Sequence, residues 1–212
     1  AVYGDPKRLY SFVLGGESLR RLSGAAEAFV AVKADAISRA LAGSAFATAF
    51  AALPASFQGN MRARGQMHVA STMAGLAFSQ AGLGMCHALS HSMGAVFHIP
   101  HGRLNGILLP EVIACNGAAA GKAYAELARI AGFPGSADTI CLRNLRNGLI
   151  RLRKELYLPA TLQEAGIPRQ KCLQFADKII QTALKDPCME TNPLKADAGV
   201  LRGILEAVTG RG

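Results

Sequence analysis

Hydrophobic and polar positions along most of the chain repeat with the period of an α-helix. Residues 17–31 and 33–53 both follow this pattern, and Pro54 is expected to end the second helix. Residues 60–93 form the longest periodic segment. Three of its glycines weaken the pattern locally, each about 1 kcal/mol less favourable than alanine inside a helix. These glycines, at positions 75, 82 and 84, indicate close approach of another backbone or of a ligand.

The second half of the chain continues the helical pattern. The stretch AVFHIP interrupts it, and a helix with an interior Pro110 follows. Further helices are expected at 118–131, 136–155, 168–185 and 196–208, with Ser136 as an N-cap and Gly132 and Gly210 at helix ends. We found no run typical of a sheet, no repeat and no low-complexity linker. The sequence therefore predicts one all-α domain over residues 1–212, a bundle of seven to nine helices.

Composition supports a compact globule. Half of the 212 residues are hydrophobic and only 17% are charged, unlike a disordered chain. No Asp, Glu, Lys or Arg occurs from Gly65 to Gly102, and an uncharged run of this length could be a membrane-spanning helix. It contains all five histidines together with several Ser and Gln residues, which hydrocarbon would not tolerate. We expect a buried helix there and no membrane partner.

The formal net charge of +9 raises the question of nucleic acid as a partner. The densest basic cluster alternates with leucine and isoleucine, which is typical of a solvated helix face; it comprises Arg143, Arg146, Arg151, Arg153 and Lys154. No recognition motif or stacking aromatics accompany it, so we expect no nucleic-acid partner. Five widely spaced cysteines, none in a C-x-x-C pair, and an opening stretch AVYGDPKRLY that is no secretory leader favour a reducing, cytoplasmic location.

Histidine clustering is the strongest chemical signal. His87, His91, His98 and His101 fall within fifteen consecutive residues, and only His68 lies elsewhere. The i, i+4 spacing of His87 and His91 would place both on one helix face. Neutral imidazole is the commonest transition-metal ligand, so His87, His91 and His101 suggest a metal or catalytic site. His68 and His98 are interpreted as hydrogen-bonded structural residues.

The residues around these histidines resemble a known family. Residues 73–112 read MAGLAFSQAGLGMCHALSHSMGAVFHIPHGRLNGILLPEV. This stretch closely resembles, without a gap, the iron-dependent (group III) alcohol dehydrogenase signature AGxAFSNAxLGxxHAxAHxLGxxxxxPHGxxNAxLLP. A weaker similarity continues through KELYLPATLQEAGI to ALKDPCMETNPLKADAGVLRGILEAV, which is similar to the family's closing motif D-x-C-x-x-x-N-P-R. Residues 60–208 thus resemble the family's C-terminal, helical, metal-binding domain.

The resemblance implies specific roles. In the family a divalent metal, usually Fe(II) and sometimes zinc, sits between an Asp, a His and two later histidines and polarises an alcohol oxygen while nicotinamide takes the hydride. By motif position the later ligands are His87 and His101, and His91 is a pocket residue that could relay a proton. Phe78 resembles an apolar position of the substrate pocket, or is an ordinary core aromatic. A small alcohol or aldehyde would be the substrate.

Two features depart from the family. Its N-terminal nucleotide-binding domain, with a GGGS-type turn, has no counterpart here, so NAD(P) would bind only if such a domain were supplied. Its first two ligands come from D-A-x-x-H-A-x-E-A-(Y/F), and aligning RRLSGAAEAFV on Glu27 puts Arg20 at the Asp position and Gly24 at the His position. We therefore expect weak Fe(II) or zinc binding and an inactive isolated chain. The alternative is a non-catalytic helical protein that kept the fold for association, and a homo-oligomer or partner chain is expected.

Overall fold

The computed structural model describes residues 16–210, and the opening stretch interpreted above as no secretory leader lies outside them. Within this range every element is a helix, which confirms the all-α prediction. The elements are α2 (Gly16–Val30), α3 (Ala36–Phe57), α4 (Met61–Ala81), α5 (Met85–Phe97), α6 (His101–Ile130), α7 (Asp138–Glu155), α8 (Arg169–Leu184), the 3-10 helix η3 (Pro187–Thr191) and α9 (Ala198–Thr209).

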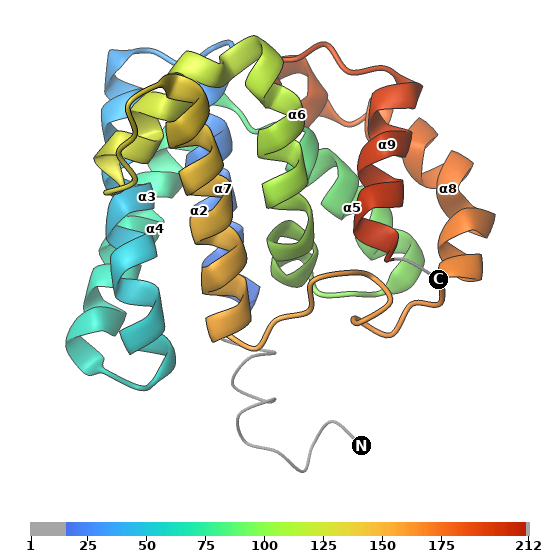
Figure 1. Ribbon diagram of the computed structural model, residues 1–212, viewed down its shortest axis with the longest axis horizontal. Helices are drawn as coiled ribbons and strands as arrows, with labels where there is room; N and C mark the ends of the chain where they lie inside the picture. Colours follow the sequence, from blue (N-terminus) through green and yellow to red (C-terminus); the bar gives the residue numbers. More distant parts are fainter. Residues whose placement is uncertain (1–15, 211–212) are drawn as a thin grey trace.

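The long helix α6 runs through the middle of the bundle (Figure 1). Helices α2, α3, α4 and α7 lie on one side of it, and α5, α8 and α9 lie on the other. The tightest pairing is α3 on α4, where both contact faces are largely alanine, for example Ala45 and Ala49 on α3 and Ala70 and Ala74 on α4. Side chains this small allow the two backbones to approach closely. Helix α2 contacts α3, α4, α5 and α6, so it carries residues into the centre of the molecule.

Several predicted helix boundaries were wrong. Pro54 lies inside α3, which continues to Phe57. The segment 60–93 is two helices, broken at residues 82–84. The predicted helices before and after residue 118 are one helix, α6, kinked at Ala120. The N-cap of α7 is Ala137, without a side-chain cap, rather than Ser136.

The glycines of the 60–93 segment differ in what surrounds them. A Cβ on Gly75 would meet no atom within 4 Å, so the expected close approach is absent there. At Gly82, where φ is +86°, a Cβ would lie 2.4 Å from Thr191 Oγ1. At Gly84 it would lie 2.8 Å from Glu27 Oε1. The close neighbours at these two positions are therefore side chains of distant segments, which reach the break between α4 and α5 because glycine leaves the space open.

One helix of the described residues, α3, is long and apolar enough to cross a membrane by length and composition, with a mean hydropathy of 1.4 over the best window. It packs against α2 and α4, and 44% of that window is buried in the molecule. Core helices of globular proteins meet the same criterion, so this is weak evidence for a span. The uncharged run 65–102 that the sequence singled out contributes no such helix.

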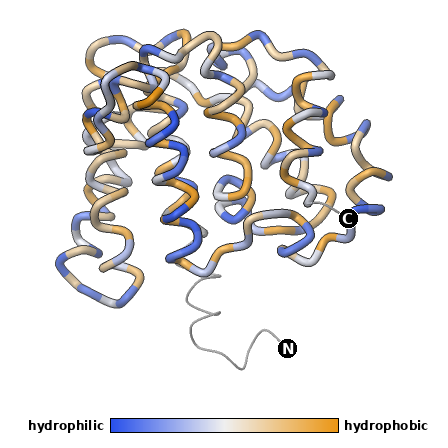
Figure 2. Tube along the Cα trace, viewed as in Figure 1, coloured by the Kyte–Doolittle hydropathy of each residue, from blue (hydrophilic) through white to orange (hydrophobic). Residues whose placement is uncertain are grey.

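Helix α7 carries the basic cluster, and hydrophilic positions alternate with hydrophobic ones along it (Figure 2). Arg143, Arg151 and Lys154 are exposed, as expected of a solvated face. Arg146 and Arg153 are half-buried against α6, which corrects that interpretation. Because Pro110 has no N–H, the carbonyl of Gly106 lacks its usual partner one turn later. The Arg153 guanidinium donates to this carbonyl at 3.4 Å.

Candidate functional site

A buried carboxylate anchors the histidine cluster. Glu27, on α2, is 1% exposed, and its Oε2 is paired with His87 Nδ1. Its Oε1 accepts a 2.7 Å hydrogen bond from the backbone N–H of Cys86, in the first turn of α5. A negative charge at a helix N-terminus is favourable, because it meets unpaired N–H groups and the positive end of the helix dipole. Glu27 therefore fixes both the start of α5 and the orientation of the His87 ring.

His87 and His101 converge on a common point. Their ring centroids are 5.0 Å apart. The Asn105 amide nitrogen lies 3.3 Å from His87 Nε2 and 3.3 Å from His101 Nε2, and it donates to Ser23 Oγ at 2.7 Å. With Nδ1 of His87 directed at Glu27, its Nε2 is the atom that faces this point, as in metal-ligating histidines whose other nitrogen binds a carboxylate. Two imidazole nitrogens that face the same neighbour are candidates for ligands to one ion.

His91 lies beside this pair and has its own acidic partner. Its ring centroid is 4.9 Å from that of His101 and 6.2 Å from that of His87. Its Nδ1 is 2.8 Å from Asp186 Oδ2, and its side chain is 48% exposed. Three of the predicted site residues are thus brought together, with His91 on the solvent side. A histidine with a carboxylate partner and access to solvent is suited to moving protons.

The environment keeps His101 neutral. Partial burial, followed by the nearby His87, His91 and Arg20, lowers the pKa of the His101 imidazole to about 3. A neutral imidazole is the form that can ligate a metal or accept a proton. Because Arg20 contributes to the lowered pKa of His101, its positive charge lies near the site. Arg20 is one turn before Gly24 and two turns before Glu27 on the same face of α2.

The residues present do not fit a tightly held Fe(II) ion. The resemblance calls for four protein ligands, and here two imidazoles converge while the Asp position holds Arg20 and the His position holds Gly24. The space beside Gly24 is filled by Phe78, whose Cδ1 lies 3.2 Å from where a Cβ would be. Catalytic metal sites usually have at least three protein ligands. A cation beside the site further opposes a divalent ion.

The two histidines interpreted as structural residues, His68 and His98, are both exposed. His68 is exposed on α4, so it is not the buried core residue expected. His98 is exposed and ends α5 in a left-handed conformation, with φ 55°.

Asn105, Asp186 and Asn192 were not predicted as partners of the site. Asn192 Oδ1 accepts from the backbone N–H of Met85, next to the Glu27 contact. The D-x-C-x-x-x-N-P motif, which supplies Asp186 and Asn192, was the available signal.

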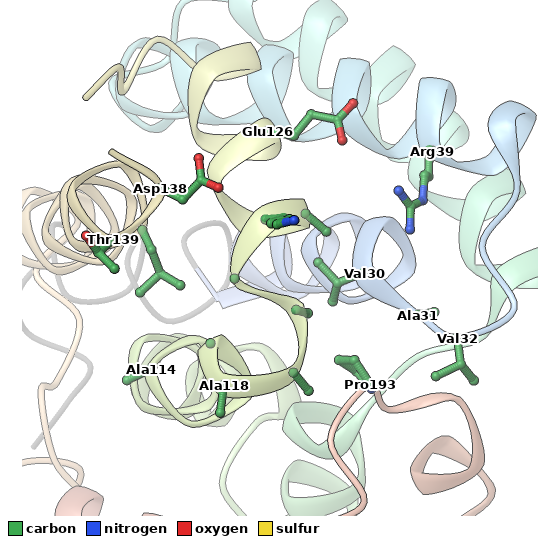
Figure 3. Close-up of a pocket in the computed structure, with 17 residues that line it drawn as sticks. Val30, Ala31, Val32, Arg39, Ala114, Ala118, Glu126, Asp138, Thr139 and Pro193 are labelled. Carbon is green, nitrogen blue, oxygen red and sulfur yellow. The ribbon is translucent and has the colours of Figure 1, made fainter. Parts of the chain in front are cut away.

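A pocket of about 880 Å³ lies elsewhere, where the kink of α6 meets the end of α2 and the start of α7 (Figure 3). Its walls are mainly alanine and glycine, and Arg39, Glu126 and Asp138 supply charge at its edges. None of the predicted site residues lines it. The cavity therefore gives no support to the histidine site.

Comparison with known proteins identifies the family to which this chain is similar. The sequence pattern of the Fe-containing alcohol dehydrogenase family, C-terminal, matches residues 18–209. The chain is 37% identical over 187 residues to an NADPH-dependent butanol dehydrogenase of Clostridium saccharobutylicum, covering 88% of this chain and 48% of that protein. It is 39% identical over 191 residues to a 1-propanol dehydrogenase of Citrobacter freundii, covering 87% and 52%.

Solved structures give the same result. A 1,3-propanediol oxidoreductase superposes with a TM-score of 0.87 at 27% identity, covering 97% of this chain and 53% of that one. An iron-containing alcohol dehydrogenase from Thermococcus thioreducens superposes with a TM-score of 0.86 at 29% identity, covering 96% and 52%. The chain spans about half the length of the relatives it matches. It belongs to the Fe-containing alcohol dehydrogenase family and corresponds to the family's C-terminal helical domain.

Proposed function

We propose that this chain is the helical, metal-binding half of an NAD(P)-linked alcohol or aldehyde oxidoreductase, and that alone it neither binds iron tightly nor oxidises alcohols. His87 and His101 are its two inherited ligand positions, His91 is its candidate proton relay, and Phe78 borders its substrate pocket. Nicotinamide binding would require a nucleotide-binding domain, since residues 16–210 contain no strand, glycine turn and helix in that order. We expect a cytoplasmic location.

One observation carries the proposal of weak metal binding. The α2 face that meets His87 and His101 has kept Glu27, which orients His87, but offers an arginine and a glycine at the two inherited donor positions. Two imidazoles and water hold Fe(II) weakly. The two Nε2 atoms face the same Asn105 amide beside the inherited donor positions, and this arrangement supports descent from a working centre.

A non-catalytic helical protein, kept for association, is the alternative function. The loss of both α2 donors favours it for the chain on its own. Three exposed apolar side chains of α4, Met61, Val69 and Leu76, are spaced by eight and seven residues and so share one helix face. We expect this face to support self-association, measured by light scattering on a sizing column. A chain that stays monomeric at high concentration would contradict that expectation.

The iron proposal is tested by restoring the donors. The chain is incubated anaerobically with Fe(II), desalted and analysed for metal. We expect well under one iron per wild-type chain, and an increase toward one in Arg20→Asp/Gly24→His. The new histidine needs Phe78 to shift by a few tenths of an ångström, so adding Phe78→Leu should raise the iron content further.

The matched control is Arg21→Asp, which makes the same charge change on the neighbouring exposed residue of α2. It should leave the iron content unchanged. Stoichiometric iron in the wild-type chain at micromolar concentration would contradict the proposal of weak binding. Failure of the double variant to gain iron, while folded by circular dichroism, would contradict the assignment of positions 20 and 24 as lost ligands.

A further inference from the structure

Three donor groups of different chemistry meet beside the histidine pair, at a place the family signature does not assign to a metal. His91 comes from α5, and Asp186 and Cys188 come from η3 and the residue before it. One ligand atom from each, an imidazole nitrogen, a carboxylate oxygen and a thiol sulfur, all lie within 4.8 Å of one another. His91 is largely open to solvent, whereas the other two are half-buried, so an ion could enter from one side.

The fold holds these groups in place before any ligand binds. Asp186 is the N-cap of η3, and its Oδ1 accepts a 2.8 Å hydrogen bond from the backbone N–H of Cys188. Its Oδ2 therefore faces away from that bond and contacts His91 Nδ1 at 2.8 Å. Pro187, between the two donors, fixes the backbone φ at the start of η3. A carboxylate oriented in this way by its second oxygen is the arrangement that supports a metal ligand.

From this geometry we propose that His91 Nδ1, Asp186 Oδ2 and Cys188 Sγ form a binding site for a divalent ion of the zinc and cobalt class. Imidazole and thiolate favour zinc over magnesium or calcium, and three protein ligands with one open position suit a four-coordinate ion. At zinc bond lengths and tetrahedral angles the nitrogen and oxygen would lie about 3.4 Å apart and the sulfur about 3.5 Å from each. The nitrogen and oxygen, now 2.8 Å apart, would open by about 0.6 Å, and a pair at the 4.8 Å limit would close by about 1.3 Å.

Binding exchanges a proton for the ion. Burial, with Asp186 close by, raises the pKa of the Cys188 thiol to about 12, so without a cation the sulfur carries its proton at neutral pH. When the ion binds, the S–H bond breaks, the proton leaves to solvent and the sulfur electron pair forms the bond to the metal. His91 ligates in its neutral form through Nδ1, so a proton on that nitrogen moves to Nε2 and the ring keeps one proton.

The site shares His91, the candidate proton relay, with the proposed hydride chemistry, but its other two donors are separate from it. It uses neither His87 nor His101, and neither Arg20 nor Gly24 belongs to it. The competing explanation is that the His91–Asp186 contact is only an ion pair joining α5 to η3. Under that explanation the Cys188 thiol is only a hydrogen-bond partner of the Asp186 carboxylate, whereas in the proposed site its sulfur is the third ligand.

Cobalt is the sharpest probe, because a bond from thiolate to Co(II) gives an intense near-ultraviolet charge-transfer band. The full chain is titrated with Co²⁺ under reducing, anaerobic conditions, and Zn²⁺ is then added to displace it. We expect one Co²⁺ per chain, a thiolate band, and loss of the band on adding Zn²⁺. Cys188→Ser should abolish the band, and His91→Gln should weaken binding at least tenfold, the least that loss of even an outer partner usually costs.

Two controls separate this site from its neighbours. Cys115→Ser changes the other half-buried cysteine, on α6, and should leave the band intact. His101→Gln disrupts the inherited pair and should also leave the band intact, so failure of the iron proposal and failure of this one are distinguishable. No thiolate band in the wild-type chain, or a band that survives Cys188→Ser, would overturn the proposal. Loss of the band with His101→Gln would place the ion at the inherited pair and overturn it too.

Discussion

Glu27 joins α2 to the first turn of α5 and to His87. It is almost fully buried, and it accepts from both the Cys86 backbone and His87. Glu27→Ala would leave both donors unpaired in the interior, so we expect a loss of about 2–5 kcal/mol in the free energy of unfolding. Glu27→Gln keeps one acceptor oxygen and should cost less. Urea unfolding measures both, and Glu126→Ala, at an exposed carboxylate, should change little; an equally small effect of Glu27→Ala would contradict the anchoring role.

His101 should make stability fall in acid. Its pKa is about 3 in the folded chain, against an ordinary value of 6.5, so between these values the unfolded state holds a proton that the folded state lacks. Stability contributed by this residue is therefore complete above about pH 6.5 and is lost as pH falls toward about 3. His101→Gln removes the titrating group and should lose less stability than wild type between about pH 7 and pH 4 in urea unfolding. Equal losses in the two proteins would contradict the assignment.

At the residue scale, the long motif and the i, i+4 spacing indicated different partners for His87. The i, i+4 rule pairs His87 with His91, yet His87 lies closer to His101, whose ring reaches the site from the start of another helix. The acidic partner of His91 is 95 residues away along the chain, and no local pattern could indicate it. The two ligand positions came from the resemblance, because a motif encodes tertiary contacts that periodicity does not.

At the scale of elements, the existence and type of the helices could be predicted, and their ends could not. Pro54 was expected to stop α3, but proline removes only one N–H, and α3 continues with Gln58 as its C-cap. The two glycines that split residues 60–93 were recognised as weak points. What makes them a break is that Thr191 and Asn192 occupy the space from the far end of the chain, which a single-segment pattern cannot show.

The α6–α7 contact offers a test of how a helix tolerates an interior proline. Arg153 donates to the Gly106 carbonyl that Pro110 leaves without a partner. Arg153→Met keeps most of the apolar stem and removes the donor, so we expect a loss of about 1–3 kcal/mol in the free energy of unfolding. Arg151→Met, at an exposed position of the same helix, should stay within about 0.5 kcal/mol of wild type. Equal effects of the two substitutions would show that this carbonyl needs no partner.

At the scale of the whole molecule, part of the basic charge behind the net +9 is engaged in contacts within the fold. Arg129, Arg146 and Arg202 are paired with carboxylates, and Arg153 is turned into the α6–α7 contact. The exposed remainder of the basic cluster is Arg143, Arg151 and Lys154 on one helix. This helix therefore offers three exposed cations, so we expect only weak binding to duplex DNA through it, without sequence preference.

Anisotropy of a labelled duplex measures this directly. Because binding through phosphates falls steeply with salt, any signal seen near 50 mM should be gone near about 200 mM, with a shallow slope that reflects few contacts. Substituting Arg143, Arg151 and Lys154 together by glutamine should lower any such signal, because the other two basic residues of α7, Arg146 and Arg153, are half-buried. Two results would contradict this expectation: tight binding that persists at the higher salt, or a salt slope that the triple variant leaves unchanged. Either would indicate a basic binding surface elsewhere on the molecule and would favour a nucleic-acid partner.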